Sequence, residues 1–529
     1  MKRILLLSFL LAAILSTVIP DLYKRSRDGL PDPLKSGIIA TRLPSRIQIG
    51  FGSVDITGHV FYDDRLGALE LPEESSLNPF LDLVRPAKDS VKTKRRRKVG
   101  RLYAKAMLFS DQKKNFGLLL SLDLPLLRQE QVKIVQESLS RHFGLNPGNI
   151  LIFYPGFFAA FSISPEKLEA AAVQAVEEAQ KHLNRSEFAL LSPETPFKNA
   201  VYSPVNVPGT GIFRTPPLCG SLNEQGEYDA SEKIYNWQRT FCEASLLNDS
   251  SSFFTVNCTT VVPQLLLFRK KGGKIMGGAI LSPVTPCLAP PGHLQEDISS
   301  DYVYHLCDYL ERKLGAPILF LRSPGSDIIP RTDAFSHPNA HRFGIQMGAA
   351  FLPLVRNALF ERISLARFFF QEVRLPLKPE AALSPEEITG LMDRYRFQSE
   401  ALKKVNIDLS VKREIQDRFL TPFFMLHYFK SFGVPGPLAL KGFRLNRLLF
   451  LGLPGETDEY TGREIRKQFP GLPLCLADRQ GSYLSAILPE AAYQGGYLPN
   501  LTPFDRKAEA RLRETAITCI EQMKGRKGL

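Results

Sequence analysis

Short apolar runs alternate along the chain with longer segments whose apolar residues recur at helical spacing. Residues 102–109, 117–122 and 149–154 read as strands, and residues 128–142 and 165–183 read as amphipathic helices. The alternation resumes after a loop-rich stretch at 195–260, with predicted strands at 273–281, 318–321, 448–453 and 474–476 and predicted helices at 301–314, 343–360, 382–408, 409–428 and 505–523. The pattern predicts an α/β fold of layered mixed β-sheets with flanking helices.

The N-terminal segment differs from the rest of the chain. Lys2 and Arg3 precede an apolar run at 4–19, which is shorter than the roughly 20 residues that span a bilayer and is followed by no clean A-x-A cleavage site. We therefore expect a signal peptide or an N-terminal membrane anchor at 1–20, a linker at 21–45 and a single large domain at 46–525. The expected location is periplasmic or extracellular, or membrane-anchored through this segment.

Composition and charge narrow the function classes. The chain has 529 residues, of which 44% are apolar and 23% charged, which excludes a disordered chain and a multi-span membrane protein. Its net charge is +13, but the densest basic run, KTKRRRK at 92–98, has no interleaved aromatic residues and no nucleic-acid-binding module around it. We expect no nucleic-acid partner. The run is interpreted as a solvated loop, with a membrane surface of anionic headgroups as the alternative.

The seven cysteines favour no metal site. An odd number leaves at least one free thiol, and none forms a C-x-x-C pair, which argues against a zinc ribbon. Cys219, Cys242 and Cys258 share the loop-rich stretch, so an exported chain is expected to form a disulfide there, with its connectivity open.

Five short motifs follow one another along the chain. They read GFGSVDIT at 50–57, LYAKA at 102–106, SLDL at 121–124, PGE at 454–456 and PEAAYQGGY at 489–497. In this order they resemble the N-terminal catalytic domain of the neutral/alkaline, non-lysosomal ceramidases. The resemblance implies the fold of that domain and zinc-dependent hydrolysis of the ceramide amide. The family's C-terminal immunoglobulin-like domain is expected to be absent.

The resemblance implies a zinc ion held by histidines, a glutamate and a tyrosine. The histidine positions are occupied here by Gly156, Phe158 and Ser282. Glu456 retains the carboxylate position, and Tyr483 matches one of the two tyrosines in the family's N-D-Y-x-G-Y segment. Two remnants do not complete a zinc site, which needs at least three good protein ligands. We expect no cofactor, with zinc only if the family site were functional.

The reactive position is also changed. The family's G-D-x-S-P segment falls on residues 326–330, where Asp327 is retained and Ile329 takes the place of the nucleophilic serine. The pattern therefore predicts a ceramidase-like framework without the ceramidase reaction. In that interpretation Phe157, Phe158 and Tyr497 are candidate contacts for a lipid or acyl-chain ligand.

Two other groups of residues could form a site in place of the lost zinc ligands and nucleophile. His337 and His341 have i, i+4 spacing that could clamp a metal, although Pro338 allows a helix there only if it lies in the first turn. Ser326 beside Asp327 could act as a displaced nucleophile if one of these histidines reached it.

Three hypotheses remain open from the sequence. The protein is a non-catalytic binding protein for a lipid, acyl chain or protein partner, an active hydrolase with a rearranged site, or a structural envelope protein. Function belongs to the site and not to the fold, so the arrangement of the site must separate them.

Overall fold

The computed structural model describes residues 47–62, 98–111, 114–156, 161–193, 262–289, 297–330, 334–384, 386–391, 432–494 and 502–525, together with strand segments at 36–42 and between 200 and 229 and a few isolated positions. The expected signal peptide or anchor at 1–20 and the cysteines at 219, 242 and 258 lie outside these residues. Within the described part, no helix combines the length and the apolar character needed to cross a membrane.

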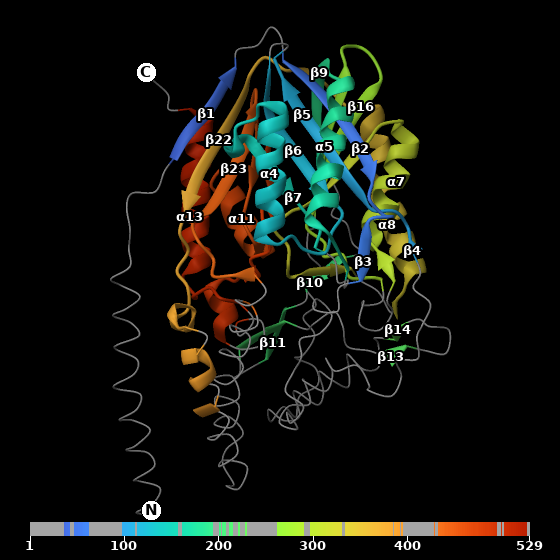
Figure 1. Cartoon of the computed structure of the whole chain (residues 1–529). Coiled ribbons are helices and arrows are strands. Elements are labelled where there is room, and N and C mark those ends of the chain that lie inside the picture. The colour runs from blue at the N-terminus through green and yellow to red at the C-terminus, as the bar shows by residue number, and fades with distance from the viewer. Residues whose placement is uncertain are drawn as a thin grey trace, which may run out of the picture.

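A nine-stranded mixed sheet forms the centre of the molecule (Figure 1). Most neighbouring strands are antiparallel, but two pairs at its ends, β16 with β18 and β6 with β7, run parallel. In spatial order the strands are β18 (Ile318–Arg322), β16 (Ile275–Ser282), β15 (Gln264–Lys270), β9 (Asn184–Leu191), β2 (Gln48–Asp55), β5 (Tyr103–Ser110), β6 (Asn115–Leu122) and β7 (Ile150–Phe153), with β21 (Glu361–Arg362) paired to β9.

A five-stranded sheet packs against the first one. Its last two strands are parallel and the others antiparallel. In spatial order it contains β1 (Ser36–Arg42), β22 (Ala366–Val373), β23 (Leu438–Leu445), β24 (Leu448–Gly452) and β26 (Leu474–Ala477).

Helices cover the outer face of each sheet, so the fold has four layers in the order helices, sheet, sheet, helices. On the nine-stranded sheet these are α4 (Gln129–Phe143), α5 (Pro165–Lys181), α7 (Tyr302–Leu314) and α8 (His337–Arg356). On the five-stranded sheet they are α11 (Glu459–Lys467) and α13 (Ala508–Lys524), drawn in orange and red in Figure 1.

Shorter elements close the ends of the layers. The 3₁₀ helices are η1 (Pro147–Asn149), η2 (Pro379–Ala382) and η3 (Glu490–Gln494). The short strand pairs and triplet are β3 (Val60–Tyr62) with β8 (Phe161–Ile163), β4 (Lys98–Val99) with β17 (Ile298–Ser299), β10 (Ala200–Tyr202) with β19 (Ile328–Pro330), β11 (Pro204–Val207) with β12 (Gly211–Arg214), β13 (Ser221–Leu222) with β14 (Tyr228–Asp229) and β20 (Ala334–Phe335), and β25 (Glu456–Thr457) with β27 (Ala486–Ile487).

Phenylalanines fill the space between the two sheets. Phe109 meets Phe368 edge-to-face with ring centroids 5.2 Å apart, and Phe443 stacks on Phe450 at 4.7 Å. All four side chains are fully buried. Because successive residues of a strand point to opposite faces, the same strands also place leucines and isoleucines against the helices. Burial of both faces explains why the strands read as continuous apolar runs.

Local signals in the sequence set the ends of the helices. Gln131 accepts a hydrogen bond from the backbone N–H of Arg128, and α4 ends at Gly144 with φ +65°. Ser336 caps α8 by accepting from the N–H of Asn339. Pro338 lies in the first turn of that helix, where its missing N–H is tolerated.

The observed elements confirm the predicted fold class. The predicted strands and helices up to residue 183 are present with ends within a few residues. One correction concerns the expected linker at 21–45, in which Ser36–Arg42 forms the edge strand β1 by pairing with β22. The predicted helices at 382–428 lie mostly outside the described residues.

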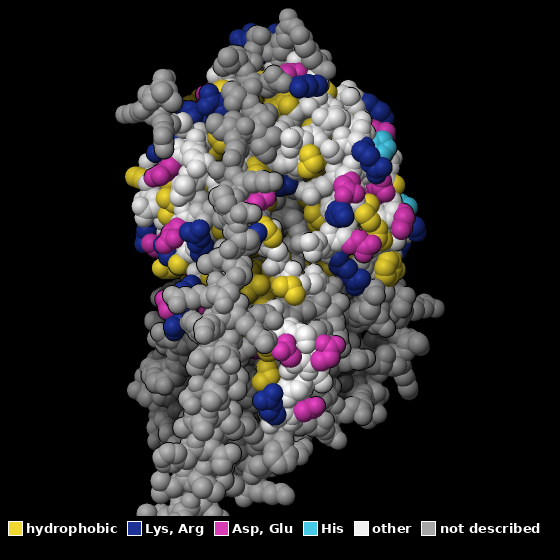
Figure 2. Space-filling view, turned by 60° about the vertical axis from the view of Figure 1, so that its left-hand side comes forward, with side chains coloured by type: hydrophobic (Ala, Val, Ile, Leu, Met, Phe, Trp, Pro, Cys, Tyr) yellow, Lys and Arg dark blue, Asp and Glu magenta, His cyan; other side chains and the backbone are white. Residues whose placement is uncertain are grey.

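The surface drawn in Figure 2 carries charges of both signs. Among its described residues, Lys and Arg side chains are interspersed with Asp and Glu.

Candidate functional site

Segments from both sheets meet beyond the carboxyl ends of parallel strands. The segment after β26 joins them, because its backbone N–H groups donate to three different strands or turns. Asp478 donates to the carbonyl of Arg322 at 2.9 Å, Arg479 to that of Gly455 at 2.8 Å, and Gly481 to that of Ile152 at 2.9 Å. This segment therefore joins the ends of β7 and β18 and the turn after β24 around one centre.

Glu456 and Arg479 form the main ion pair of this centre. Their Oε1 and Nη2 atoms are 2.7 Å apart, and the arginine side chain is only 6% exposed. The Arg479 guanidinium also lies over the ring of Tyr154, 5.7 Å from its centroid. Although burial lowers the pKa of Arg479, the Glu456 carboxylate raises it above its usual value. Arg479 therefore carries its positive charge at neutral pH.

Gly156 makes room for the Arg479 guanidinium. A Cβ atom at this glycine would lie 1.3 Å from Nη1 of Arg479, and the glycine has φ +67°. Any larger side chain at position 156 would therefore require the arginine to move. Arg479 itself has φ +56°, a left-handed conformation that is uncommon for residues other than glycine.

Arg322 is a second arginine in the same centre. Its side chain is fully buried, and within the part of the chain that the structure describes none of its three nitrogen atoms has a hydrogen-bond partner. The neighbouring carboxylate of Asp478 is 4.0 Å away from Nε, beyond hydrogen-bond distance. Burial and the nearby Arg479 guanidinium lower the pKa of Arg322 below its usual value. An arginine nevertheless stays charged in proteins, so this positive charge is buried beside the Asp478 carboxylate with no hydrogen bond to it.

The two tyrosines of the centre are protonated at neutral pH. Burial raises the pKa of Tyr154 well above its usual value and that of Tyr483 to about 12. The Tyr154 hydroxyl is buried without a hydrogen-bond partner, whereas the Tyr483 side chain is partly buried against the helical layer. Both are therefore phenols and not phenolates.

Comparison with solved structures identifies the fold. The neutral ceramidase from Pseudomonas aeruginosa superposes with a TM-score of 0.59 at 14% identity, covering 92% of this chain and 76% of that one. A ceramidase complexed with C2 gives a TM-score of 0.57 at 14% identity, covering 91% and 76%. The chain has the neutral ceramidase fold. No protein-family model and no curated protein matches the sequence, so the likeness concerns the fold alone.

The residues at the expected zinc positions of this ceramidase fold do not suit zinc. Gly156 offers no donor atom, and the Ser282 hydroxyl lies 3.2 Å from that of Tyr302. The remaining carboxylate, on Glu456, already pairs with a guanidinium. Zinc prefers imidazole and thiolate donors, and among the described residues no three His, Cys, Asp or Glu side chains converge as a metal site would require.

The expected nucleophile segment has a structural role. Ile329 lies in β19 and pairs with Val201 of β10. The Asp327 carboxylate accepts the N–H of Glu459 at 2.8 Å, and the Ser326 hydroxyl donates to Asp458 at 2.6 Å. These bonds attach the segment to the start of α11.

The two histidines of α8 point to different partners. His337 Nε2 lies 3.0 Å from an oxygen of Asp297, while the ring of His341 packs edge-on against His305 at 4.8 Å. The i, i+4 spacing is thus real, but within the described part of the chain these rings meet Asp297 and His305 and form no metal-binding cluster. Burial lowers the pKa of His305 to about 4, which keeps that ring neutral.

The remaining candidate residues are not placed. Phe157, Phe158 and Tyr497 lie outside the described residues, so their role as ligand contacts stays a prediction. Glu456 and Tyr483, by contrast, do lie at the same centre, since both act electrostatically on Arg479.

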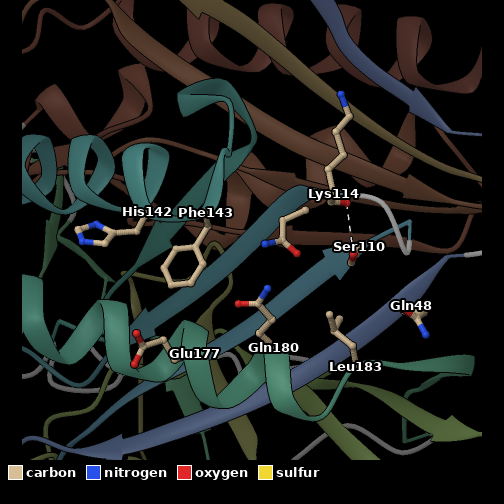
Figure 3. A pocket seen from close by; sticks show the side chains of 9 residues that line it. Gln48, Ser110, Lys114, His142, Phe143, Glu177, Gln180 and Leu183 are labelled. Atoms are coloured by element: carbon tan, nitrogen blue, oxygen red, sulfur yellow. Dashed lines mark hydrogen bonds between the residues drawn. The ribbon is translucent and has the colours of Figure 1, made fainter.

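A separate pocket lies at the opposite end of β6. It has a volume of about 550 Å³ and is lined by polar side chains including Gln48, Ser110, Lys114, Glu177 and Gln180 (Figure 3). It lies between the C-terminal ends of α4 and α5. The centre around Arg322 and Arg479, called the arginine centre below, lies beyond the carboxyl ends of the strands. We assign no chemistry to this pocket.

Sequence reasoning did not single out the two arginines. Arg479 occupies the acidic position of the family's N-D-Y-x-G-Y segment, and that change of sign was the signal available in the sequence. Arg322 ends a strand that was predicted at 318–321 as purely apolar, so a charged residue directly after a buried strand was the corresponding signal there.

Proposed function

We propose that this protein is a ceramidase-fold binding protein that takes up an acyl lipid and does not carry out zinc-dependent amide hydrolysis. The observation that carries the proposal is the ion pair between Glu456 and Arg479 at 2.7 Å. Glu456 is the carboxylate that remains at a family ligand position, and the Arg479 guanidinium already pairs with it. A divalent metal bound there would be repelled by this positive charge.

The changes at the neighbouring positions support the same conclusion. A zinc hydrolase needs a Lewis acid that polarises the carbonyl and activates a nucleophile. At this centre Gly156 and Ser282 replace nitrogen donors, and Ile329 replaces a hydroxyl. The lipid part of the proposal rests on the likeness to ceramidases, and the N-terminal apolar segment supports action in the cell envelope.

Metal content and turnover together test the proposal. We expect protein purified without chelator to contain less than about 0.1 equivalent of zinc, since the donors that supply most of the binding free energy are missing. Fluorescent ceramide should bind without being cleaved, and a chelator should leave the melting temperature unchanged. Stoichiometric zinc together with turnover that is abolished in Glu456→Ala would overturn the proposal.

A rearranged hydrolase predicts a different result. It would cleave ceramide without zinc and would lose that activity on Ser326→Ala. The matched control is Ser140→Ala, which removes a serine hydroxyl that caps the end of α4 by donating to Leu145, far from the centre. A purely structural protein would neither bind nor cleave the lipid.

A further inference from the structure

Donor groups exceed acceptor groups in the buried centre. Among the described residues, three nitrogen atoms of Arg322, Nε of Arg479 and the hydroxyl of Tyr154 are buried without a hydrogen-bond partner. Oδ1 of Asp478 is the unpartnered acceptor that the described residues place beside them. Buried polar groups are almost always satisfied, so a concentration of unmatched donors indicates a site that receives an acceptor.

The charges of the centre point the same way. Glu456 balances Arg479 at 2.7 Å, whereas among the described residues the ion pair of the Arg322 guanidinium is with Asp478 at 4.0 Å. Asp478 is itself held elsewhere, because its Oδ2 atom accepts the N–H of Thr457 at 3.0 Å. A buried guanidinium without hydrogen bonds is strongly unfavourable, and its planar fork matches the two oxygens of a carboxylate or phosphate.

We propose that Arg322, with Arg479 and Tyr154 beside it, binds an oxyanion, namely the carboxylate or phosphate group of the ligand. The inference rests on the proposed function and deepens it, because it makes an acidic acyl lipid a tighter ligand than a neutral amide such as ceramide. The centre reaches solvent at Glu456, whose side chain is 20% exposed. Arg322 is the group that pairs with the anion, while Arg479 contributes its free Nε.

Wild-type protein provides the first test. Inorganic phosphate and acetate, titrated at constant ionic strength against chloride, should raise the melting temperature in proportion to the logarithm of their concentration, as for a ligand that binds only the folded state. Myristate provides the lipid arm. If myristate binds at least about tenfold tighter than acetate, the site takes the acidic group of an acyl lipid. If the two bind equally, the site takes a free anion. Equal effects of phosphate, acetate, myristate and chloride would overturn the inference.

Two variants isolate the arginine. Arg322→Met should weaken anion binding at least about tenfold, and Arg322→Lys should weaken it less, because the charge stays while the two-pronged geometry is lost. The control Arg312→Met removes an exposed arginine that pairs with Asp308 on α7 and should leave binding unchanged. If Arg322→Met does not fold, the comparison of anions on wild-type protein still decides. Unchanged binding in a folded Arg322→Met protein would also overturn the inference.

The outcomes separate this inference from the proposed function. Zinc-free, inactive protein that binds neutral ceramide but no anion leaves the proposed function standing and removes the oxyanion site. Stoichiometric zinc with ceramide turnover removes the proposed function itself, whichever anions bind.

Discussion

The guanidinium of Arg479 fills the space in which a side chain at Gly156 would lie. A Cβ atom there would be 1.3 Å from Nη1 and 2.1 Å from Cζ of the arginine. Position 156 is one of those at which the family resemblance implies a metal-binding histidine. A zinc ligand at this position and the buried arginine are thus mutually exclusive, and the two substitutions belong together.

This exclusion predicts the effect of Gly156→Ala. Both Gly156 and Gly144 have positive φ, at +67° and +65°, so alanine at either position carries a backbone penalty of roughly 1–2 kcal/mol. Only Gly156 adds a collision, since nothing lies within 4 Å of a Cβ at Gly144. We expect Gly156→Ala to lose about 1–3 kcal/mol more than Gly144→Ala, measured by urea unfolding. Equal losses would show that the arginine moves away freely.

The Glu456–Arg479 pair should be strongly coupled in stability. A double-mutant cycle with Glu456→Gln and Arg479→Met should give a coupling energy of about 2–3 kcal/mol, because breaking a buried pair leaves an uncompensated charge. The matched control is the Glu459–Arg463 pair, which has the same 2.7 Å separation but an arginine side chain that is 44% exposed. That cycle should give less than about 0.5 kcal/mol. Similar values in the two cycles would contradict the assignment.

The sequence predicted the strands and helices of the layered fold better than it predicted the residues of the site. Alternating strand and helix patterns are local, so elements such as α5 and β18 could be placed from periodicity alone. The two-sheet core was harder to predict, because β22 and β23 pair across more than 60 intervening residues and each strand reads simply as apolar. Strand β1 was missed for a similar reason, since its pairing with a strand more than 300 residues away leaves no local signal.

The arginine centre required the folded structure. The motif resemblance implied which positions had lost metal-binding donors, among them Gly156 and Ser282. That Arg479 occupies the vacated space depends on the turn after β26, whose N–H groups bond to three other segments. Such long-range bonds determine where a side chain points and leave no pattern in the sequence around it.

The phenylalanine layer between the sheets should dominate stability. Phe109 is fully buried and contacts the rings of Phe116, Phe368 and Phe443. Phe109→Ala should lower the free energy of unfolding by about 3–5 kcal/mol, because the close-packed rings cannot collapse into the cavity. The control Leu359→Ala changes a side chain that is 92% exposed and should stay within about 0.5 kcal/mol of wild type. A loss below about 1 kcal/mol for Phe109→Ala would indicate a core that can rearrange.

Lys441 should make stability depend on pH in the alkaline range. This lysine of β23 is 5% exposed, and its Nζ donates to the carbonyls of Pro147 at 2.9 Å and Ile150 at 3.0 Å, which ties the two sheets together. Burial lowers its pKa from 10.5 to about 8. Between these two values the unfolded chain binds the proton that the folded protein has released, so the free energy of unfolding rises with pH in this window.

The comparison of wild type with Lys441→Met isolates this contribution. Relative to the variant, wild-type protein should gain about 3 kcal/mol of stability between pH 8 and pH 10.5, with no relative change between pH 6 and pH 7, where the lysine is protonated in both states. Urea unfolding across this range measures the difference. The control Lys133→Met removes a lysine whose side chain is 73% exposed on α4 and reports the effect of losing a surface lysine. A difference in the free energy of unfolding between wild type and Lys441→Met that stays constant with pH would contradict this. It would mean that the carbonyls of Pro147 and Ile150 compensate for the burial of the amine.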